Sequence, residues 1–486
     1  MEDVIANKPK ASLETTEKIV AQLDDLPLPE ELQHLDEDER IKLERSLVRR
    51  LDCTLMPVVA LLFLLNILDR NNIANAKIAG LTKTLDITNS QYNTCLMIFY
   101  VGCPIQHDHY EISMCQAFTK NYGGLFASRF VLGLVEAPFL PGVFYLMSCW
   151  YSRAELPPRI AILYGSNMLA SAFGGLIAAG IVSRMEGKAG RPAWEWLFII
   201  EGSITIVIAL LCVPILPDFP LQKTSPILKR EHQLFAEYRL RKENAGIRDE
   251  DPESIWWGLK QALLDPKLYM FILLQMMLIT AQSFNNFFPS IVGTLGYDTT
   301  VTLLLTAPPY LFAFIVSLCV SFHAAHKKER GWHIAIPMIV GLLGNLLAMF
   351  VPSLGGRYFS MFLMTSGTYA PYNLCVSWLS ASLPRPASKR AAALAIINLM
   401  AAGVAHFYTS YAFPDSQKPR YYGGGGMMSA ACLLCSGTAI FIKYYLKRQN
   451  AKMEREELEE GRVGGGIKGS KAGHGGEAIV RFRYVH

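Results

Sequence analysis

The chain has 486 residues, of which 51% are hydrophobic and 18% charged, with a formal net charge of +5. Apolar stretches of about 20 residues recur along it, each long enough to cross the ~30 Å hydrocarbon core of a bilayer as a helix. This composition excludes a soluble globular protein. The positive charge lies in loops and tails, so it indicates membrane topology and not a nucleic-acid partner.

Residues 1–50 are polar and mixed in charge, and we expect them to form a cytoplasmic tail. The first residues contain no basic segment leading into an apolar one, so a cleaved signal peptide is not expected. The stretch "DEDERIKLERSLVRR" at 36–50 predicts an amphipathic helix at the membrane surface.

Ten apolar stretches predict complete spans, and one more at 91–105 is too short to cross. The complete ones are 54–74, 124–150, 160–183, 195–216, 268–291, 303–325, 333–352, 358–381, 391–412 and 424–446. A long basic linker at 217–267 separates an N-terminal bundle (51–216) from a C-terminal bundle (268–446), a layout typical of transporters built from two repeats. The tail 447–486 is charged and then glycine-rich, which predicts disorder.

Lys and Arg assign the sides of the membrane. They are enriched in "YSRAELPPR", in the linker, in "HKKERGW", in "LPRPASKR" and after the last span, which places both termini in the cytoplasm. The first span then leaves the cytoplasm and the span 124–150 returns to it. An even number of crossings must lie between them, where the sequence has only half a span.

The half span is followed by "CPIQHDHYEIS" at 103–113, which holds His107, Asp108, His109 and Glu111. Fifteen helical residues cover only about 22 Å, against ~30 Å for the hydrocarbon core. A metal site of a membrane-embedded metalloenzyme is one interpretation, but adjacent loop side chains rarely converge on a metal without distant ligands. The sequence has no HExxH or P-loop pattern, so we expect no enzyme, metal or cofactor.

Asp69 and Arg70 stand at the end of the first predicted span. Ionised groups at membrane depth are costly unless paired or facing a water-filled cavity, and they usually mark a transport pathway. We expect Arg70 to bind an anionic substrate through its fork of donors and Asp69 to carry a proton. The alternative is an interfacial ion pair that caps the span.

Arg129 and Glu136 are seven residues apart in an apolar segment, so they share one face of a helix about two turns apart. A carboxyl whose protonation depends on its partner suits proton coupling. The alternative is a protonated, structural Glu136 bonded to a neighbouring helix.

Weaker candidates for substrate contacts are amides and aromatic residues within spans. Asn167 lies in a small-residue stretch whose main role is expected to be close helix packing. Tyr369 and Asn373 would suit a flat organic acid, although aromatic packing explains them equally well. Asn398 and His406 are eight residues apart and carry little weight alone.

The motifs "LDRNNIANAKIAGL", "NYGGLFASRFVLGLVEAPFLPGVFYLMSCWY", "YNLCVSWLSASLPRPASKRAAA" and "RAAALAIINLMAAG" resemble the fungal anion:cation symporter branch of the major facilitator superfamily, the allantoate and nicotinate permease-like proteins. The resemblance runs from about residue 51 to residue 446. It implies an all-α polytopic fold of two six-helix bundles and proton-driven uptake of organic anions. It also implies the helix 1 Asp-Arg pair at Asp69 and Arg70, and the helix 4 Arg and Glu at Arg129 and Glu136.

Two departures from the family stand out. Asn398 is followed by Ala401 and Ala402, where the family usually continues N-x-x-G-N. The larger departure is at 103–113, which replaces the rest of helix 2, a basic loop and helix 3. We interpret this as a local deletion or a mis-drawn exon boundary that leaves about ten or eleven spans. We expect the chain as written to fold poorly or not to transport.

The sequence thus predicts a proton-coupled transporter that imports a small organic anion by alternating access. The substrate would be a monocarboxylate such as the vitamin nicotinate, or an allantoate-like anion. We expect a multi-pass monomer in the plasma membrane. The alternatives are a truncated relative without transport activity and a ligand sensor.

Overall fold

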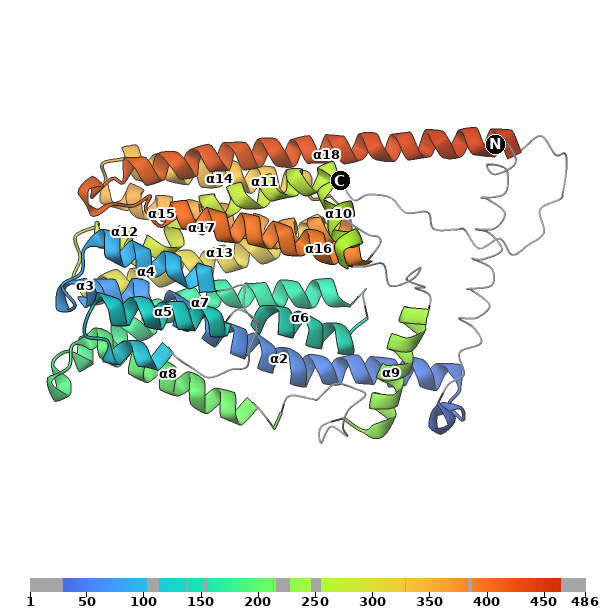
Figure 1. The fold of residues 1–486 in the computed structure, drawn as a ribbon, viewed down its shortest axis with the longest axis horizontal. Helices are drawn as coiled ribbons and strands as arrows, with labels where there is room; N and C mark the ends of the chain where they lie inside the picture. Colours follow the sequence, from blue (N-terminus) through green and yellow to red (C-terminus); the bar gives the residue numbers. More distant parts are fainter. Residues whose placement is uncertain are drawn as a thin grey trace.

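The computed structural model describes residues 29–102, 113–136, 139–152, 155–212, 214–215, 228–245, 255–327, 329–382 and 387–464. These residues are almost entirely helical, with no strand among them, and most helices run along the long axis of the molecule (Figure 1). The residues 103–112, with His107 and His109, where the sequence predicts a deletion, lie outside the described residues.

The N-terminal half comprises α2 (Glu37–Ile78), α3 (Leu81–Thr84), α4 (Asn89–Gly102), the 3-10 helix η2 (Ser113–Phe118), α5 (Tyr122–Glu136), α6 (Phe139–Trp150), α7 (Leu156–Met185) and α8 (Ala193–Cys212). The linker contains α9 (Arg230–Ala245) and α10 (Ile255–Leu263). The C-terminal half comprises α11 (Pro266–Ala281), η4 (Ser283–Phe287), α12 (Phe288–Gly293), α13 (Thr299–Lys327), α14 (Gly331–Phe350), α15 (Leu354–Ser382), α16 (Ala387–Asn398), the π-helix η5 (Leu399–Val404), α17 (Ala405–Thr409) and α18 (Tyr422–Gly464). Short 3-10 turns η1 (Glu30–Leu32), η3 (Lys188–Gly190) and η6 (Asp415–Gln417) complete the described elements.

Eight helical segments of the described chain are long and apolar enough to cross a membrane. They correspond to eight of the ten complete spans predicted from the sequence. The ninth, 124–150, is divided between α5 and α6. The tenth forms α15, which is 29 residues long but rich in Ser, Thr, Tyr and Asn. Several of these side chains are buried against other helices, which explains the lower hydropathy of α15.

The first span belongs to one continuous helix, which also contains the surface helix predicted at 36–50. Asp36 caps α2, and Glu39 completes a capping box with the Asp36 backbone. The helix then continues for 42 residues, about 63 Å, to the turn at Gly80. It is about twice as long as the ~30 Å hydrocarbon core, so its charged first turns project beyond the membrane.

The last span also continues as a helix beyond the membrane. α18 runs to Gly464, so residues 447–464 of the tail predicted to be disordered are helical. Residues 465–486 lie outside the described part. The charged residues 447–460 include many strong helix formers, which explains why the helix does not stop at the end of the apolar stretch.

Helix α9 of the linker lies across the first turns of α2 (Figure 1). Arg239 binds Glu44 of α2 at 3.4 Å and Glu155, at the start of α7, at 2.5 Å. His232 lies 3.1 Å from the Ser46 hydroxyl. Burial opposes ionisation of Glu155, but hydrogen bonds from the Ser152 backbone and from Arg239 lower its pKa below the ordinary value.

The two halves show matching ion pairs at the end of the molecule where α9 lies. Arg159 at the start of α7 binds Asp52 of α2 in a bidentate manner, with both N–O distances 2.7 Å. Lys389 of α16 binds Asp265, at the start of α11, at 2.7 Å. In each half, the pair joins the first predicted span to the last but one. This correspondence is expected of two structurally repeated bundles.

The halves meet along α7 and α13 and along α4 and α17. A Cβ atom at Gly175 of α7 would lie 2.1 Å from Thr306 Oγ1 and 2.9 Å from the Leu303 carbonyl, both on α13. The glycine therefore permits this close approach, as expected for the small-residue stretch at 165–181. On the other side, the Thr94 and Tyr411 hydroxyls lie 3.0 Å apart.

The chain enters and leaves the short α4 region at the same end of the molecule. Asn89, the first residue of α4, accepts a hydrogen bond from Lys77 near the end of α2. Phe118, at the end of η2, lies against Arg191 in the loop between α7 and α8. Between these points, the described chain contains only the 14 residues of α4 as a partial crossing.

Candidate substrate site between the two halves

Arg70 lies well inside α2, eight residues before its last residue, Ile78. The helix thus continues for about two turns beyond the pair that the sequence places at the end of the first span. Asp69 is only 4% exposed, which contradicts the alternative of a pair that caps the span at the interface. Both residues lie where the neighbouring helices enclose α2.

Arg70 pairs with Glu136 across two helices. Its Nη2 atom lies 3.4 Å from Oε2 of Glu136, the last residue of α5. The Glu136 side chain is 7% exposed, whereas that of Arg70 is 31% exposed. The Arg70 guanidinium also lies 4.9 Å from the centre of the Phe99 ring of α4. Glu136 is therefore enclosed, and Arg70 is the more accessible member of the pair.

Arg129 interacts with both members of this pair. It is 1% exposed, and its Nη1 donates a hydrogen bond of 3.4 Å to the backbone carbonyl of Arg70. It also interacts electrostatically with Glu136, and Asn66 of α2 hydrogen bonds to the same carboxyl. Arg129 Nε and Nη2 are buried without a hydrogen-bond partner among the described residues. The structure thus brings three of the four predicted charges into one group.

The C-terminal half faces Arg70 with aromatic and imidazole rings. Tyr372 of α15 and His406 of α17 both lie close enough to Arg70 to interact with it electrostatically. The His406 ring stacks on Tyr100 of α4, with 3.8 Å between centroids. Tyr164 of α7 packs edge-on against Tyr372 at 5.4 Å. Arg70 therefore lies where the two halves meet.

Two of the remaining predicted substrate contacts, Tyr369 and Asn167, lie close to the boundary between the halves. Tyr369 is buried beside Tyr310 and within hydrogen-bonding reach of Ser171 on α7. Asn167, half-buried, accepts at its backbone carbonyl from the Ser171 hydroxyl. These residues adjoin the boundary between the halves.

Asn373 and Asn398 are placed differently. The Asn373 amide donates to Ser317 of α13 at 3.4 Å, within the C-terminal half. Asn398 is exposed at the end of α16, and the contacts of the described residues do not join it to the group around Arg70.

Sequence reasoning missed several neighbours of Arg70. Phe99 and Tyr100 lie in a short apolar stretch with no charge to single them out. The sequence indicates no partner for His406, since its contact with α4 spans about 300 residues of sequence. The π-helix η5 directly precedes α17. Such π-helical turns are frequent at functional sites, but the sequence gives no signal for them.

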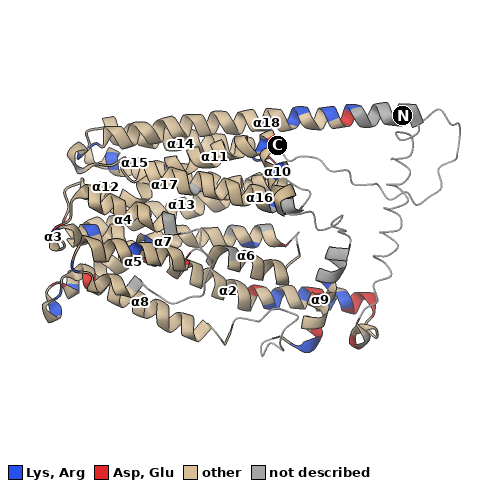
Figure 2. Ribbon diagram, viewed as in Figure 1, with Lys and Arg blue, Asp and Glu red and all other residues tan. Residues whose placement is uncertain are grey.

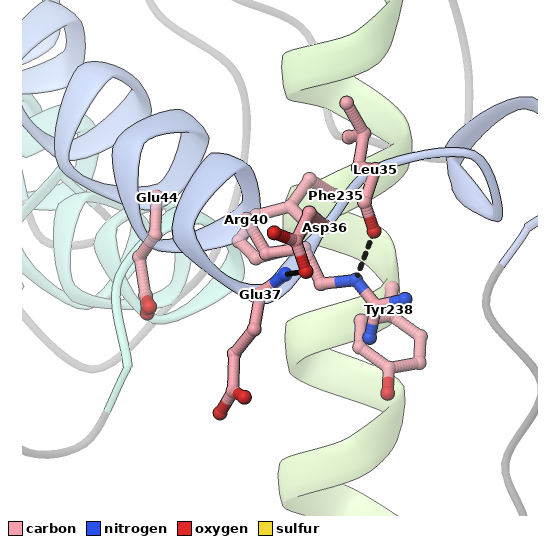
Figure 3. Close-up of a pocket in the computed structure, with 7 residues that line it drawn as sticks. All are labelled: Leu35, Asp36, Glu37, Arg40, Glu44, Phe235 and Tyr238. Carbon is pink, nitrogen blue, oxygen red and sulfur yellow. Dashed lines mark hydrogen bonds between the residues drawn. The ribbon is translucent and has the colours of Figure 1, made fainter.

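Two surface pockets lie far from this group. One of about 490 Å³ is enclosed by the start of α2 and by α9, and Figure 3 shows its residues. There Arg40 donates to the Leu35 carbonyl at 3.0 Å, with Phe235 and Tyr238 of α9 opposite. The second, around Arg45 and Glu155, adjoins the first. Neither contains a predicted site residue.

The described residues contain no group of three His, Cys, Asp or Glu side chains that would hold a metal ion. The sequence 103–112 lies outside them, so the prediction about His107 and His109 is not tested.

A bundle of long apolar helices in two similar halves, with a buried charged group between them, defines a polytopic membrane transport protein. The family described as the Major Facilitator Superfamily matches residues 112–410, and the chain belongs to it. The predicted all-α fold of this superfamily is thereby confirmed.

Relatives and solved structures agree with this assignment. The MFS-type transporter cnsO of Penicillium expansum is 30% identical over 91% of this chain and 90% of its own length. An uncharacterized transporter of Schizosaccharomyces pombe is 31% identical over 93% of both chains. The proton:xylose symporter XylE from E. coli superposes with a TM-score of 0.57 at 14% identity, covering 81% of this chain and 95% of that one. These relatives support a secondary transporter, and the XylE likeness concerns the fold alone.

Proposed function

We propose that this protein is a proton-coupled secondary transporter that imports a small organic anion by alternating access, within the anion:cation symporter branch. One observation carries the proposal: the Arg70–Glu136 pair, 3.4 Å apart, lies where the two halves meet. The pair joins a partly accessible cation to an enclosed carboxyl. Tyr372 and His406 of the opposite half lie close to the same cation.

The pair gives a physical basis for coupling. While Glu136 is ionised, it pairs with the Arg70 guanidinium, which is then less available to bind an anionic substrate. Protonation removes the charge of Glu136 and weakens the pair, which releases the planar donor fork of Arg70 for a substrate carboxylate. Proton and anion therefore favour each other's binding, and this coupling is reciprocal by thermodynamic linkage.

The neighbouring residues have supporting roles in the proposed site. The Arg129 hydrogen bond to the Arg70 carbonyl fixes α2 against α5. We assign Tyr369, Asn373 and Asn167 to substrate binding and Asp69 to proton transfer. The exposed Asn398 is left out of the site.

Aromatic rings around Arg70 favour a flat substrate. Two ring pairs, Tyr100 with His406 and Tyr164 with Tyr372, form contacts across the boundary between the halves. Rings of this kind stack well on a planar acid. An aromatic monocarboxylate such as nicotinate is therefore our first choice, and an allantoate-like anion is the second.

Charge distribution supports cytoplasmic termini. Lys and Arg, interspersed with Asp and Glu, gather at the end of the molecule where the start of α2, α9 and the charged part of α18 lie (Figure 2). Lys and Arg near span ends are retained on the cytoplasmic side. We place the protein in the plasma membrane as a monomer, with the bundles 51–216 and 268–446 moving against each other.

A second candidate function is a truncated relative that does not transport. Helix α4 has 14 residues, about 21 Å of helix against a ~30 Å core. The superfamily match begins at residue 112, directly after this break. The alignment with the Penicillium expansum relative runs over 472 positions but covers 91% of the 486 residues, so about thirty positions of the relative have no counterpart here. These observations favour loss of the second half of helix 2 together with helix 3.

One experiment tests both candidates. The chain as written and a version with the missing segment restored from the Schizosaccharomyces pombe relative are expressed in cells without their own carrier. Uptake of labelled nicotinate and allantoate is measured at acidic and neutral external pH, with and without a protonophore. We expect pH-driven accumulation by the restored version only. Accumulation that ignores the proton gradient would contradict proton coupling, and full activity of the 486-residue chain would contradict the deletion.

A further inference from the structure

A chain of hydrogen bonds joins three helices of the C-terminal half. His323, near the end of α13, and His333, in the first turn of α14, place their Nδ1 and Nε2 atoms 2.7 Å apart. The other ring nitrogen of His333, Nδ1, lies 2.6 Å from Oε2 of Glu329, in the turn between these helices. Lys443 of α18 binds Oε1 of the same carboxylate at 2.9 Å. The two rings therefore link α13 to α14, and Glu329 continues the link to α18.

This group lies at the boundary of the membrane. Lys443 follows Tyr422, the first residue of α18, by 21 residues, which is about 32 Å of helix. The hydrocarbon core is ~30 Å thick. His323 is exposed, and the side chain of His333 is 15% exposed. Protons from the water at this surface therefore reach the rings.

The partners fix the hydrogen positions on the rings. Ionised Glu329 only accepts hydrogen bonds, so Nδ1 of His333 carries a hydrogen and Nε2 of the neutral ring accepts. Nδ1 of His323 is then the donor to this Nε2 atom. Burial opposes ionisation of Glu329, but hydrogen bonds from Lys443, the Trp332 backbone and His333 lower its pKa below the ordinary value. The acceptor at the end of the chain is therefore ionised at neutral pH.

The contact between the rings depends on the number of protons that they hold. One added proton leaves the contact intact, because one ring still offers a lone pair to an N–H group of the other. A second added proton makes both rings donors, so that two positively charged N–H groups face each other where the nitrogens are 2.7 Å apart. This arrangement contains no acceptor, and the like charges repel. Histidine changes its charge between about pH 5 and pH 8, so mild acid should separate the rings.

The other charged groups around the pair are cations. His326 and Lys327 form the end of α13, and both are exposed. Arg330, in the turn, donates to a backbone carbonyl of α15 at 2.9 Å, and α18 contributes Lys443. The sequences of α13, α14 and α15 contain no Asp or Glu, so Glu329 of the turn is the acid that compensates a proton on the pair.

We propose that His323 and His333 form a proton-binding site that holds the end of α13 against α14 and releases it when both rings are protonated. The site goes beyond the proposed function, because it lies within one half and is separate from the group around Arg70. It acts on a helix that the other half contacts, since Thr306 of α13 packs against Gly175 of α7. The pH on this side of the membrane therefore acts on the boundary between the halves.

The first test is deuterium exchange at the Cε1 carbon of each histidine ring, measured by mass spectrometry in the purified full chain. This exchange reports how far each ring is protonated at a given pH. We expect the two rings to take up their protons in two steps, separated by more than about tenfold in proton concentration. His323→Gln should leave a single step at His333. His326→Gln is the matched control on the same helix, and it should leave both steps in place.

A second readout follows the contact itself. Backbone amide exchange in the last turn of α13, corrected for its intrinsic dependence on pH, should become faster in acid in the parent. In His323→Gln it should be equally fast at acidic and neutral pH. His323 is exposed, so this variant should fold as the parent does.

Three results would overturn the proposal. One is a His333 exchange curve that is the same in the parent and in His323→Gln. Another is amide exchange at the end of α13 that does not respond to pH in the parent. The third is a response that disappears when a chelator is added, because a metal cation would then lie between the rings. Both readouts lie within the C-terminal half and require no transport, so their outcome is independent of the proposed function.

Discussion

Replacing Glu136 with Gln should separate substrate binding from proton coupling. The pair distance of 3.4 Å corresponds to about 5 kcal/mol of attraction at an effective dielectric constant of about 20. Arg70 is 31% exposed, and solvent screening reduces this value. We expect about 1–3 kcal/mol to remain as coupling, which is a factor of about 5–150 in affinity.

The pH dependence of binding gives the assay. In the unaltered site, anion affinity should fall as pH rises, because ionised Glu136 forms an ion pair with Arg70 and competes with the anion. Glu136→Gln should bind as the protonated form does at every pH, so its affinity at high pH should exceed that of the parent. Equilibrium binding of labelled substrate to the restored version at several pH values measures this. A variant with the pH dependence of the parent would refute the reasoning, and Asp69 would then be the next candidate.

Three further substitutions test other parts of the account. Arg70→Lys keeps the charge but loses the bidentate fork, and we expect substrate affinity in the restored version to fall at least tenfold, about 1.4 kcal/mol. Gly175→Ala places a methyl group against α13, and we expect a loss of about 1–3 kcal/mol in thermal unfolding. Arg239→Ala should release α9, measured as faster limited proteolysis of the linker. The pKa of Glu155 is lowered in the fold, so its contribution is present at neutral pH and lost as the pH falls. Acid should therefore weaken protection of α9 in the parent more than in Arg239→Ala.

Each of these has a control on the same element. Unchanged uptake affinity in Arg70→Lys would remove Arg70 from the site. Gly180→Ala, on the same helix, has no atom within 4 Å of the new methyl and should leave stability unchanged or slightly higher. Equal effects at Gly175 and Gly180 would contradict the packing argument. Arg230→Ala removes an exposed ion pair with Glu31. In this control the rate of proteolysis of the linker should be nearly the same as in the parent.

The positions of the spans were predictable because few backbone conformations are stable within lipid. Backbone groups in hydrocarbon must bond within the segment, so long apolar stretches become helices. The ends of α2 and α18 were not predictable from hydropathy. Their charged extensions are helical because caps and helix formers decide helix length once water is available.

The charged residues of the site were found by their rarity in apolar stretches, but their pairing was not. Sequence adjacency suggested Asp69 with Arg70, and helical spacing suggested Arg129 with Glu136. The structure instead pairs Arg70 with Glu136, which is 66 residues away. Such a contact depends on how α2 packs against α5, which no local pattern contains.

Glu201, a buried acid of α8, could have been identified as a candidate from the sequence alone. It is the one acid in the interior of the apolar stretch 195–216, whose first residue is Glu195, and the rule that singled out Glu136 applies to it equally.

The central claim is that movement of the anion through this site carries a proton with it. The most direct measurement is the internal pH of liposomes containing the restored version when substrate anion is added outside. The account predicts acidification of the interior, and none with Glu136→Gln, although that variant should still exchange labelled for unlabelled anion. Anion uptake by the unaltered site with no movement of protons would contradict it.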